Sequence, residues 1–304
     1  MIHLPTLRSV RTIVTHAGCP DGIASAMILH NAIPDARIVF LRHGSPEMNG
    51  LTAEPGMLFC DICPPAARVA EFVAEGAIVL DHHGTARDVV AAFEDRGVFG
   101  DEKTEPGVCG AWLAYREVWA PLDEGLVDSP ATVERFATLA GIRDTWRRDD
   151  LRWDEACAQA AALRFYPVED LLDLSPEGWE DAMAIGPTLM RNGALAVAAH
   201  IRDAMRLDVH GQRVAIIPTV ETSDVMDALA EEVDIVAGFA LRCDNGQARM
   251  VVSLRGRGVD VSAIAKRYGG GGHTAAAGFT CDLTATTPHP WICVPNLLRV
   301  ALVG

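Results

Sequence analysis

Residues 77–84 read AIVLDHHG, a short apolar run that leads directly into an acidic residue and two histidines. Three more apolar runs are followed at once by polar or small residues: 12–15, 38–41 and 57–60. Helical patterns at 23–31 and 65–75 lie among these runs, and such alternation is typical of a parallel sheet wrapped by helices. Ligands of such sheets bind outside the carboxyl ends of the strands. We therefore expect the polar residues after each run to line a site.

The pattern changes in the second half of the chain. Residues 187–207 predict one helix that begins with proline near its first turn. It is followed by three strand patterns, a hairpin turn signal and a helix pattern: 213–217, 235–241, 249–254, Asp244-Asn245-Gly246 and 262–268. The fold class predicted is α/β, with a parallel-sheet domain over 1–186, a linker helix over 187–207 and a smaller α/β domain over 208–304.

The charge of the chain limits the kinds of partner it can bind. Among 304 residues, 26 Lys and Arg stand against 41 Asp and Glu, a net charge of −15. A long duplex is not expected, because that affinity comes from many cations that neutralise many phosphates. Residues 1–15 lack the apolar core of a signal peptide, and no run of 18 apolar residues occurs. We expect a cytoplasmic protein without membrane contact.

The eight cysteines are too sparse for a disulfide scaffold. Only Cys60 and Cys63 have the close spacing of zinc ligands, and no second pair completes a four-ligand site. We favour the interpretation that they are small buried thiols at a strand end.

Four groups of carboxylates and imidazoles could bind a metal. They are His16 with Asp21, Asp61, Asp81-His82-His83, and Asp144. Each alone has an ordinary structural explanation as a turn, a helix cap or a polar loop. Three of the four follow strands of one predicted sheet, however, and their oxygen and nitrogen donors suit Mn²⁺ or Mg²⁺. The set has enough ligands for a two-metal site.

The motifs resemble those of a known family. His16, Asp21-Gly22, Asp61, Asp81-His82-His83 and Asp144 resemble the motifs of DHH phosphoesterases. In the second half, three stretches resemble the DHHA1 domain that often accompanies them: Ser253-Leu254-Arg255 with 259–265, Gly269-Gly270-Gly271-Gly272-His273, and 275–279. The resemblance covers residues 12–279.

The resemblance implies a divalent-metal phosphohydrolase, usually with two Mn²⁺ ions, whose metal-activated water cleaves phosphoester bonds of small nucleotides or short oligonucleotides. His16, Asp21, Asp61, His82 and Asp144 would be metal ligands, with Asp61 bridging both ions. His83 would face the substrate phosphate, and Asp81 would orient the histidines. Implied substrates are short oligoribonucleotides, linear dinucleotides and a 3′-phosphorylated adenosine nucleotide such as pAp. A homodimer is left open.

The first motif departs from the family pattern. Many members have Asp-x-Asp, one aspartate for each metal, whereas Asp21-Gly22 is followed here by Ile23. The loop resembles instead a subgroup with His-x-x-Cys-x-Asp-Gly, which His16, Cys19, Asp21 and Gly22 match. We expect one metal to have fewer protein ligands, with water or a substrate oxygen completing its shell.

The glycine run before His273 predicts a phosphate-binding loop. Consecutive glycines allow close backbone approach to a phosphate, and a helix started at 274–278 would add its positive end. The alternative is a flexible linker, which fits a run between helical patterns less well. Gly270, Gly271, Gly272, His273 and Arg255 are therefore predicted to bind substrate, Arg255 through its guanidinium fork. Arg257 and Lys266 are expected on a solvated face.

Two other functions remain open from the sequence. One is a nucleotide-binding regulatory module with reduced chemistry, prompted by the missing second aspartate. The other is a polyphosphatase or pyrophosphatase, although the glycine motif favours nucleotides because members acting on inorganic phosphates generally resemble a different second domain.

Overall fold

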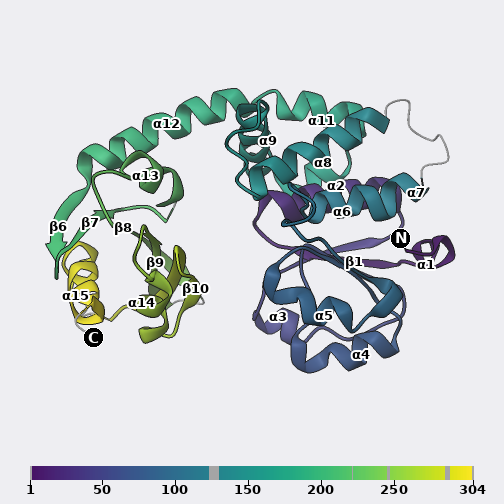
Figure 1. Cartoon of the computed structure of the whole chain (residues 1–304), viewed down its shortest axis with the longest axis horizontal. Helices are drawn as coiled ribbons and strands as arrows, with labels where there is room; N and C mark the ends of the chain where they lie inside the picture. The colour runs from purple at the N-terminus through teal and green to yellow at the C-terminus, as the bar shows by residue number, and fades with distance from the viewer. Residues whose placement is uncertain (1, 123–129, 221, 245–246, 285–287, 303–304) are drawn as a thin grey trace. The chain divides into compact units, whose positions relative to one another are not determined.

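The computed structural model describes residues 2–122, 130–220, 222–244, 247–284 and 288–302. The chain divides into two compact units, Met1–Met190 and Arg191–Gly304. The helix α12, Gly186–Asp203, contains the division between them (Figure 1). The structure thus has an α/β architecture with two separate sheets.

The sheet of the first unit has five parallel strands in the order β2-β1-β3-β4-β5. Their bounds are β1 Thr12–His16, β2 Arg37–Leu41, β3 Met57–Cys60, β4 Ile78–Asp81 and β5 Gly97–Phe99. The central strands β3 and β4 are fully buried, because helices cover both faces of the sheet. This is the sheet that the apolar runs predict.

Side chains alternate between two cores along these strands. Ile13, Leu58 and Ile78 lie in the core shared with α2 Pro20–Ala32, α6 Gly110–Ala114 and α8 Pro130–Asp144. The residues that follow each of them, Val14, Phe59 and Val79, lie in the core on the opposite face, under α4 Val69–Ala74 and α5 Arg87–Ala91. Figure 1 shows the two helical layers on either side of the sheet. Because side chains point to opposite faces at alternate positions along each strand, one strand packs against both helical layers.

The described residues of the first unit form further helices. They are α1 Leu4–Arg8, α3 Pro46–Asn49, α7 Ala120–Leu122, α9 Trp153–Phe165, α10 Val168–Leu172 and α11 Pro176–Met183. Three 3-10 turns lie at Ala66–Arg68, Gly84–Ala86 and Glu94–Arg96, and a π-helical segment spans Tyr115–Trp119.

The second unit has a mixed six-stranded sheet in the order β10-β11-β9-β8-β7-β6. Among the described residues of this unit, only β7 and β8 pair in parallel. The strands are β6 Met205–Val209, β7 Gln212–Ile217, β8 Ile235–Asp244, β9 Gln247–Gly256, β10 Gly271–His273 and β11 Ala276–Asp282. The helices are α13 Thr222–Ala228, α14 Val261–Arg267 and α15 Pro290–Leu302. The hairpin predicted at 244–246 joins β8 to β9, but residues 245 and 246 lie outside the described residues.

Two predictions in this unit are wrong. The helix predicted over 187–207 ends at Asp203, because Met205, Arg206 and Leu207 pair with β7 in an antiparallel ladder. No helix starts at 274–278, where β10 and β11 form a hairpin instead. Pairing of β11 with β9 buries Ala277 and Phe279 on the same face, and this outweighs the helical preference of the alanine run.

Candidate metal centre

The carboxyl ends of three neighbouring strands place most of the predicted metal ligands. His16 ends β1, Asp61 directly follows β3, and Asp81 ends β4 just before His82. These strands are adjacent and parallel, so their ends meet at one edge of the sheet. Two helices bring the remaining ligands there, since Asp21 lies in the first turn of α2 and Asp144 ends α8. The structure therefore gathers all five predicted metal ligands at one place.

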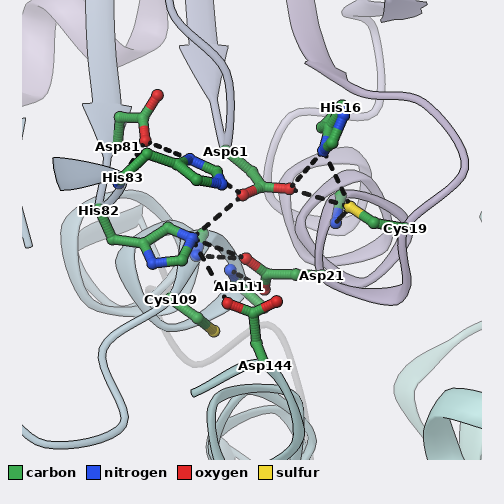
Figure 2. Close-up of polar contacts among 12 residues, drawn as sticks. His16, Cys19, Asp21, Asp61, Asp81, His82, His83, Cys109, Ala111 and Asp144 are labelled. Atoms are coloured by element: carbon green, nitrogen blue, oxygen red, sulfur yellow. Dashed lines mark hydrogen bonds and ion pairs between the residues drawn. The ribbon is translucent and has the colours of Figure 1, made fainter. Parts of the chain in front are cut away.

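Asp61 is the central carboxylate of this cluster (Figure 2). Its Oδ2 lies 3.8 Å from His16 Nδ1, while its Oδ1 lies 3.2 Å from His82 Nε2 and 4.0 Å from His83 Nδ1. The residue has a φ of 61°, in the left-handed region that aspartate tolerates better than most residues. This turn directly after β3 presents one carboxylate oxygen to each of two groups of donors.

The second group of donors contains Asp21, His82 and Asp144. His82 Nε2 lies 3.6 Å from Asp21 Oδ2 and 3.5 Å from Asp144 Oδ2. The backbone of α6 fixes the Asp21 carboxylate. Its two oxygens accept hydrogen bonds from the backbone N–H groups of Gly110, at 2.6 Å, and Ala111, at 2.9 Å. These N–H groups begin α6 and carry the positive end of its dipole.

Gly110 is a residue of the site that the sequence analysis did not identify. A Cβ at this position would lie 2.5 Å from the Asp61 Cβ and 2.9 Å from Asp21 Oδ2. Glycine is therefore required for α6 to approach both carboxylates. A single glycine in a helical pattern gave no sequence signal of this role.

Asp81 faces His83 and not the centre of the cluster. Its Oδ1 accepts a hydrogen bond from the His83 backbone N–H at 2.9 Å and lies 2.8 Å from His83 Nδ1, while the Cys63 thiol donates to Oδ2 at 3.1 Å. Burial alone would raise the pKa of Asp81, but the hydrogen bonds and charge of His83 lower it on balance. Burial would lower the pKa of His83, and the bond to Asp81 raises it instead. The pair fixes the orientation of the His83 ring.

The cluster concentrates negative charge away from water. Burial, followed by the charge of Asp21, raises the pKa of Asp61 well above its usual range. Partial withdrawal of the Asp144 carboxylate from water and the charge of Asp21 raise its pKa to about 6. Burial and then the charges of His43 and His83 lower the pKa of His16, which favours the neutral imidazole that binds metals. A cation at this place would relieve the repulsion among the carboxylates.

The donor atoms fit one or more divalent cations. Three groups of side chains have donor atoms within 4.8 Å of one another: His16, Cys19 and Asp61; Asp61, His82 and His83; Asp21, His82 and Asp144. Carboxylate oxygens and imidazole nitrogens suit Mn²⁺, and carboxylates also suit Mg²⁺. Asp61 and His82 each belong to two of these groups, so the groups are contiguous.

Cys19 lies in the cluster although the sequence analysis did not include it among the ligands. Its Sγ lies 3.2 Å from His16 Nδ1, donates to Asp61 Oδ2 at 3.2 Å, and accepts from the Gly22 N–H at 3.1 Å as the N-cap of α2. Ile23, by contrast, packs against the apolar core. The His-x-x-Cys spacing was the signal that could have identified Cys19.

A small pocket adjoins the cluster within the first unit. It has a volume of about 270 Å³, and its lining includes His43, His83, Cys63 and Pro64. The ring centroids of His43 and His83 are 6.1 Å apart, with the rings nearly perpendicular. His83 thus lies in the wall of a pocket whose other lining residues carry no acidic or lysine and arginine side chains.

The predicted substrate residues lie in the second unit. Arg255 lines a pocket of about 610 Å³ together with Gly269, Gly270 and Gly278. Its Nε donates to Ser223 Oγ at 3.0 Å and its Nη1 to the Leu254 carbonyl at 3.0 Å. Within the described residues its hydrogen bonds go to hydroxyl and carbonyl oxygens and to no carboxylate, so the guanidinium charge is available to an anion.

The glycine run does not form the predicted loop before a helix. The Gly270 N–H donates to the Ala265 carbonyl at 2.9 Å, and Gly271 and Gly272 pair with β11. The run therefore lacks a helix N-terminus and uses part of its backbone for pairing. The side chain of His273 lies outside the described part of the chain.

Other sequence predictions have simple outcomes. Cys60 and Cys63 are buried, and Arg257 and Lys266 are exposed. Among the described residues, no helix is both long and apolar enough to cross a bilayer.

Comparison with protein families matches residues 208–289 to the DHHA1 domain. The match confirms the DHHA1 resemblance that the second-half motifs indicate, and it is consistent with a DHH-family phosphoesterase. No curated protein matches the chain.

The solved structures that the chain is similar to include three bacterial proteins. An uncharacterised protein from Helicobacter pylori is 12% identical with a TM-score of 0.44, covering 96% of this chain and 98% of its own. A pGpG-specific phosphodiesterase from Vibrio cholerae is 16% identical with a TM-score of 0.43, covering 96% and 99%. An exopolyphosphatase-related protein from Bacteroides fragilis is 11% identical with a TM-score of 0.45, covering 100% and 97%.

Proposed function

We propose that the protein is a divalent-metal-dependent phosphohydrolase that cleaves phosphoester bonds of small nucleotides or short oligonucleotides. The observation that carries the proposal is the position of Asp61, whose two oxygens face two different groups of metal-type donors. A carboxylate so placed is suited to bridge two cations. The DHHA1 match over 208–289 supports the same class of function.

His16, Asp21, Asp61, His82 and Asp144 would hold the metal, with Mn²⁺ as the first candidate and Mg²⁺ as the second. When bound, the metal supplies Lewis-acid stabilisation of phosphoryl oxygens and a water of lowered pKa. The chain contributes the fixed positions of the ligands. The N–H groups of Gly110 and Ala111 hold Asp21, and the turn after β3 holds Asp61.

His83 is proposed to contact the substrate phosphate, and Asp81 to position it. The hydrogen bond from His83 Nδ1 to Asp81 leaves Nε2 as the nitrogen free to face substrate. A buried carboxylate behind an imidazole raises its basicity and fixes its tautomer. His83 can therefore hold a proton at a defined atom beside the metal ligands.

The second unit is proposed to bind a phosphate of the substrate through Arg255. A guanidinium that donates to Ser223 and a carbonyl, in a pocket that glycines leave open, suits an anion better than a neutral group. The net charge of −15 restricts this attraction to a short range, which favours small substrates over long duplexes. The DHHA1 match favours nucleotides over inorganic polyphosphate. Cytoplasmic location and a homodimer remain predictions.

The test is an assay of the purified full chain with Mn²⁺ on short oligoribonucleotides, linear dinucleotides, pAp and inorganic polyphosphate. We expect turnover of at least one nucleotide, which a chelator abolishes and added Mn²⁺ restores. Preferred hydrolysis of polyphosphate would show that the substrate is an inorganic polyphosphate and not a nucleotide. Tight nucleotide binding without turnover under saturating Mn²⁺ would instead make the protein a regulatory binding module.

A further inference from the structure

Cys19 has the surroundings of a metal ligand. Its Sγ lies 3.2 Å from His16 Nδ1 and 3.2 Å from Asp61 Oδ2, and those two atoms lie 3.8 Å from each other. Sulfur, nitrogen and oxygen ligands of zinc-like ions lie about 2.0–2.3 Å from the metal, so two ligands of one ion are separated by at most about 4 Å. The three donor atoms are therefore close enough to one another to bind the same ion.

The spacing in the sequence gives an independent indication. Cys19 is the N-cap of α2, and Asp21 lies two residues later in the first turn of the same helix. Asp21 belongs to the group with His82 and Asp144, and Cys19 belongs to the group with His16 and Asp61. The start of one helix therefore supplies one side chain to each of the two groups of donors. Ile23, which packs in the core, takes no part.

We infer that Cys19 is a metal ligand, and that the group of His16, Cys19 and Asp61 prefers a borderline or soft ion such as Zn²⁺, Fe²⁺ or Co²⁺ over Mg²⁺. Thiolate sulfur selects softer ions, whereas carboxylates and water suit Mg²⁺ and Mn²⁺. The group of Asp21, His82 and Asp144 has no sulfur donor, and we expect it to prefer harder ions such as Mg²⁺ and Mn²⁺. The inference rests on the proposed metal centre and gives its two halves different metal preferences.

Cobalt spectroscopy tests the inference without an activity assay. The metal-free full chain is titrated with Co²⁺, and absorption is recorded in the visible region, for bound cobalt, and in the near ultraviolet, for thiolate-to-cobalt charge transfer. We expect both signals in the wild type. Cys19→Ser should lose the charge-transfer band and keep the visible bands. Serine also caps helices, so this variant keeps the cap of α2.

Cys63→Ser is the matched control, because the Cys63 thiol, like that of Cys19, donates a hydrogen bond to an aspartate near the site. It should keep the charge-transfer band. A second variant, Cys19→Asp, makes the first motif Asp-x-Asp, and the ratio of Zn²⁺ to Mg²⁺ affinity should fall roughly tenfold or more. The ratio of Zn²⁺ to Mg²⁺ affinity in Cys19→Asp also tests the inference if the Cys19→Ser variant fails to fold.

The outcomes separate the ligand from the proposed function. Visible cobalt bands without charge transfer in the wild type, or charge transfer that persists in Cys19→Ser, would overturn the assignment of Cys19 and leave the metal centre in place. Absence of any bound-cobalt signal, with no binding of Mn²⁺ by calorimetry, would overturn the metal centre and Cys19 with it.

Discussion

The two units contain polar sites of opposite character. The first unit gathers Asp21, Asp61 and Asp144 with imidazoles at the carboxyl end of a parallel sheet, a site whose negative charge calls for a cation. The second unit presents Arg255 among hydroxyl groups and glycines on a mixed sheet, a site suited to an anion. A metal phosphohydrolase needs both kinds of site. Under the proposed function, the first unit would hold the activating metal and the second unit would bind a phosphate of the substrate.

The largest expected effect comes from removing the central carboxylate. Asp61→Asn keeps the shape of the side chain but removes the charge that faces both donor groups. We expect hydrolysis to fall roughly a thousandfold or more and Mn²⁺ affinity, measured by calorimetry, to fall with it. Asp88→Asn, at an exposed position of α5, is the control and should retain both. Near-normal activity of Asp61→Asn would show that the carboxylate cluster of the first unit does not catalyse hydrolysis.

The anion site of the second unit should affect substrate binding more than chemistry. Arg255→Ala should raise KM roughly 10- to 100-fold, the value of a charge-assisted hydrogen bond, with a smaller change in kcat. Arg257→Ala is the matched control, since the Arg257 side chain is 58% exposed and should leave KM unchanged. A loss confined to kcat in Arg255→Ala would break the division of labour between the units.

The residue behind His83 should have an intermediate effect. Asp81→Asn removes the charge that fixes the His83 ring, and we expect kcat to fall roughly 10- to 100-fold. The pH profile should also change, because the raised pKa of His83 depends on its bond to Asp81. Steady-state kinetics between pH 5 and 9 would show the shift. An unchanged profile together with a lower melting temperature would indicate a structural role only.

The smallest expected effect concerns the stability of the metal-free protein. The pKa of Asp144 is raised from 3.8 to about 6, so between these values the folded chain binds this proton more tightly than the unfolded chain does. Its contribution to stability therefore rises as the pH falls from 7 to 5. In a chelator, acidification should shift the melting temperature upward by roughly 1–3 °C more in the wild type than in Asp144→Asn.

Added Mn²⁺ should reverse the sign of this difference, since the metal binds the deprotonated carboxylate and its stabilising effect falls as the pH falls. Equal pH dependence of the melting temperatures of the wild type and Asp144→Asn in the chelator would contradict a raised pKa of Asp144 in the metal-free protein.

Much of the first unit could be predicted from local patterns. The runs at 12–15, 38–41 and 57–60 lie within the observed strands or coincide with them. The run at 57–60 forms β3, which is buried along its whole length, as a continuous apolar run predicts. Polar residues directly after such strands must meet at one edge, so His16, Asp61 and His82 could be identified together. The DHHA1 motifs could likewise be identified.

The second unit shows where local patterns fail. The alanines before Phe279 favour a helix by propensity, yet the segment forms β11 because a partner strand far away in the sequence covers it. Residues 205–207 also form a strand in place of the predicted helix, because they pair with β7, the next strand along the chain. Propensity is a property of a segment, whereas pairing depends on what lies beside it.

By itself the sequence determined the parallel sheet and the residue types of the candidate site, since burial and strand direction follow from local chemistry. Only the tertiary structure decided that Cys19 and not Ile23 lies beside Asp61, and that Gly110 admits α6 to the carboxylates. Each of these depends on distances between segments up to 90 positions apart. Such distances are set by packing, which no local pattern encodes.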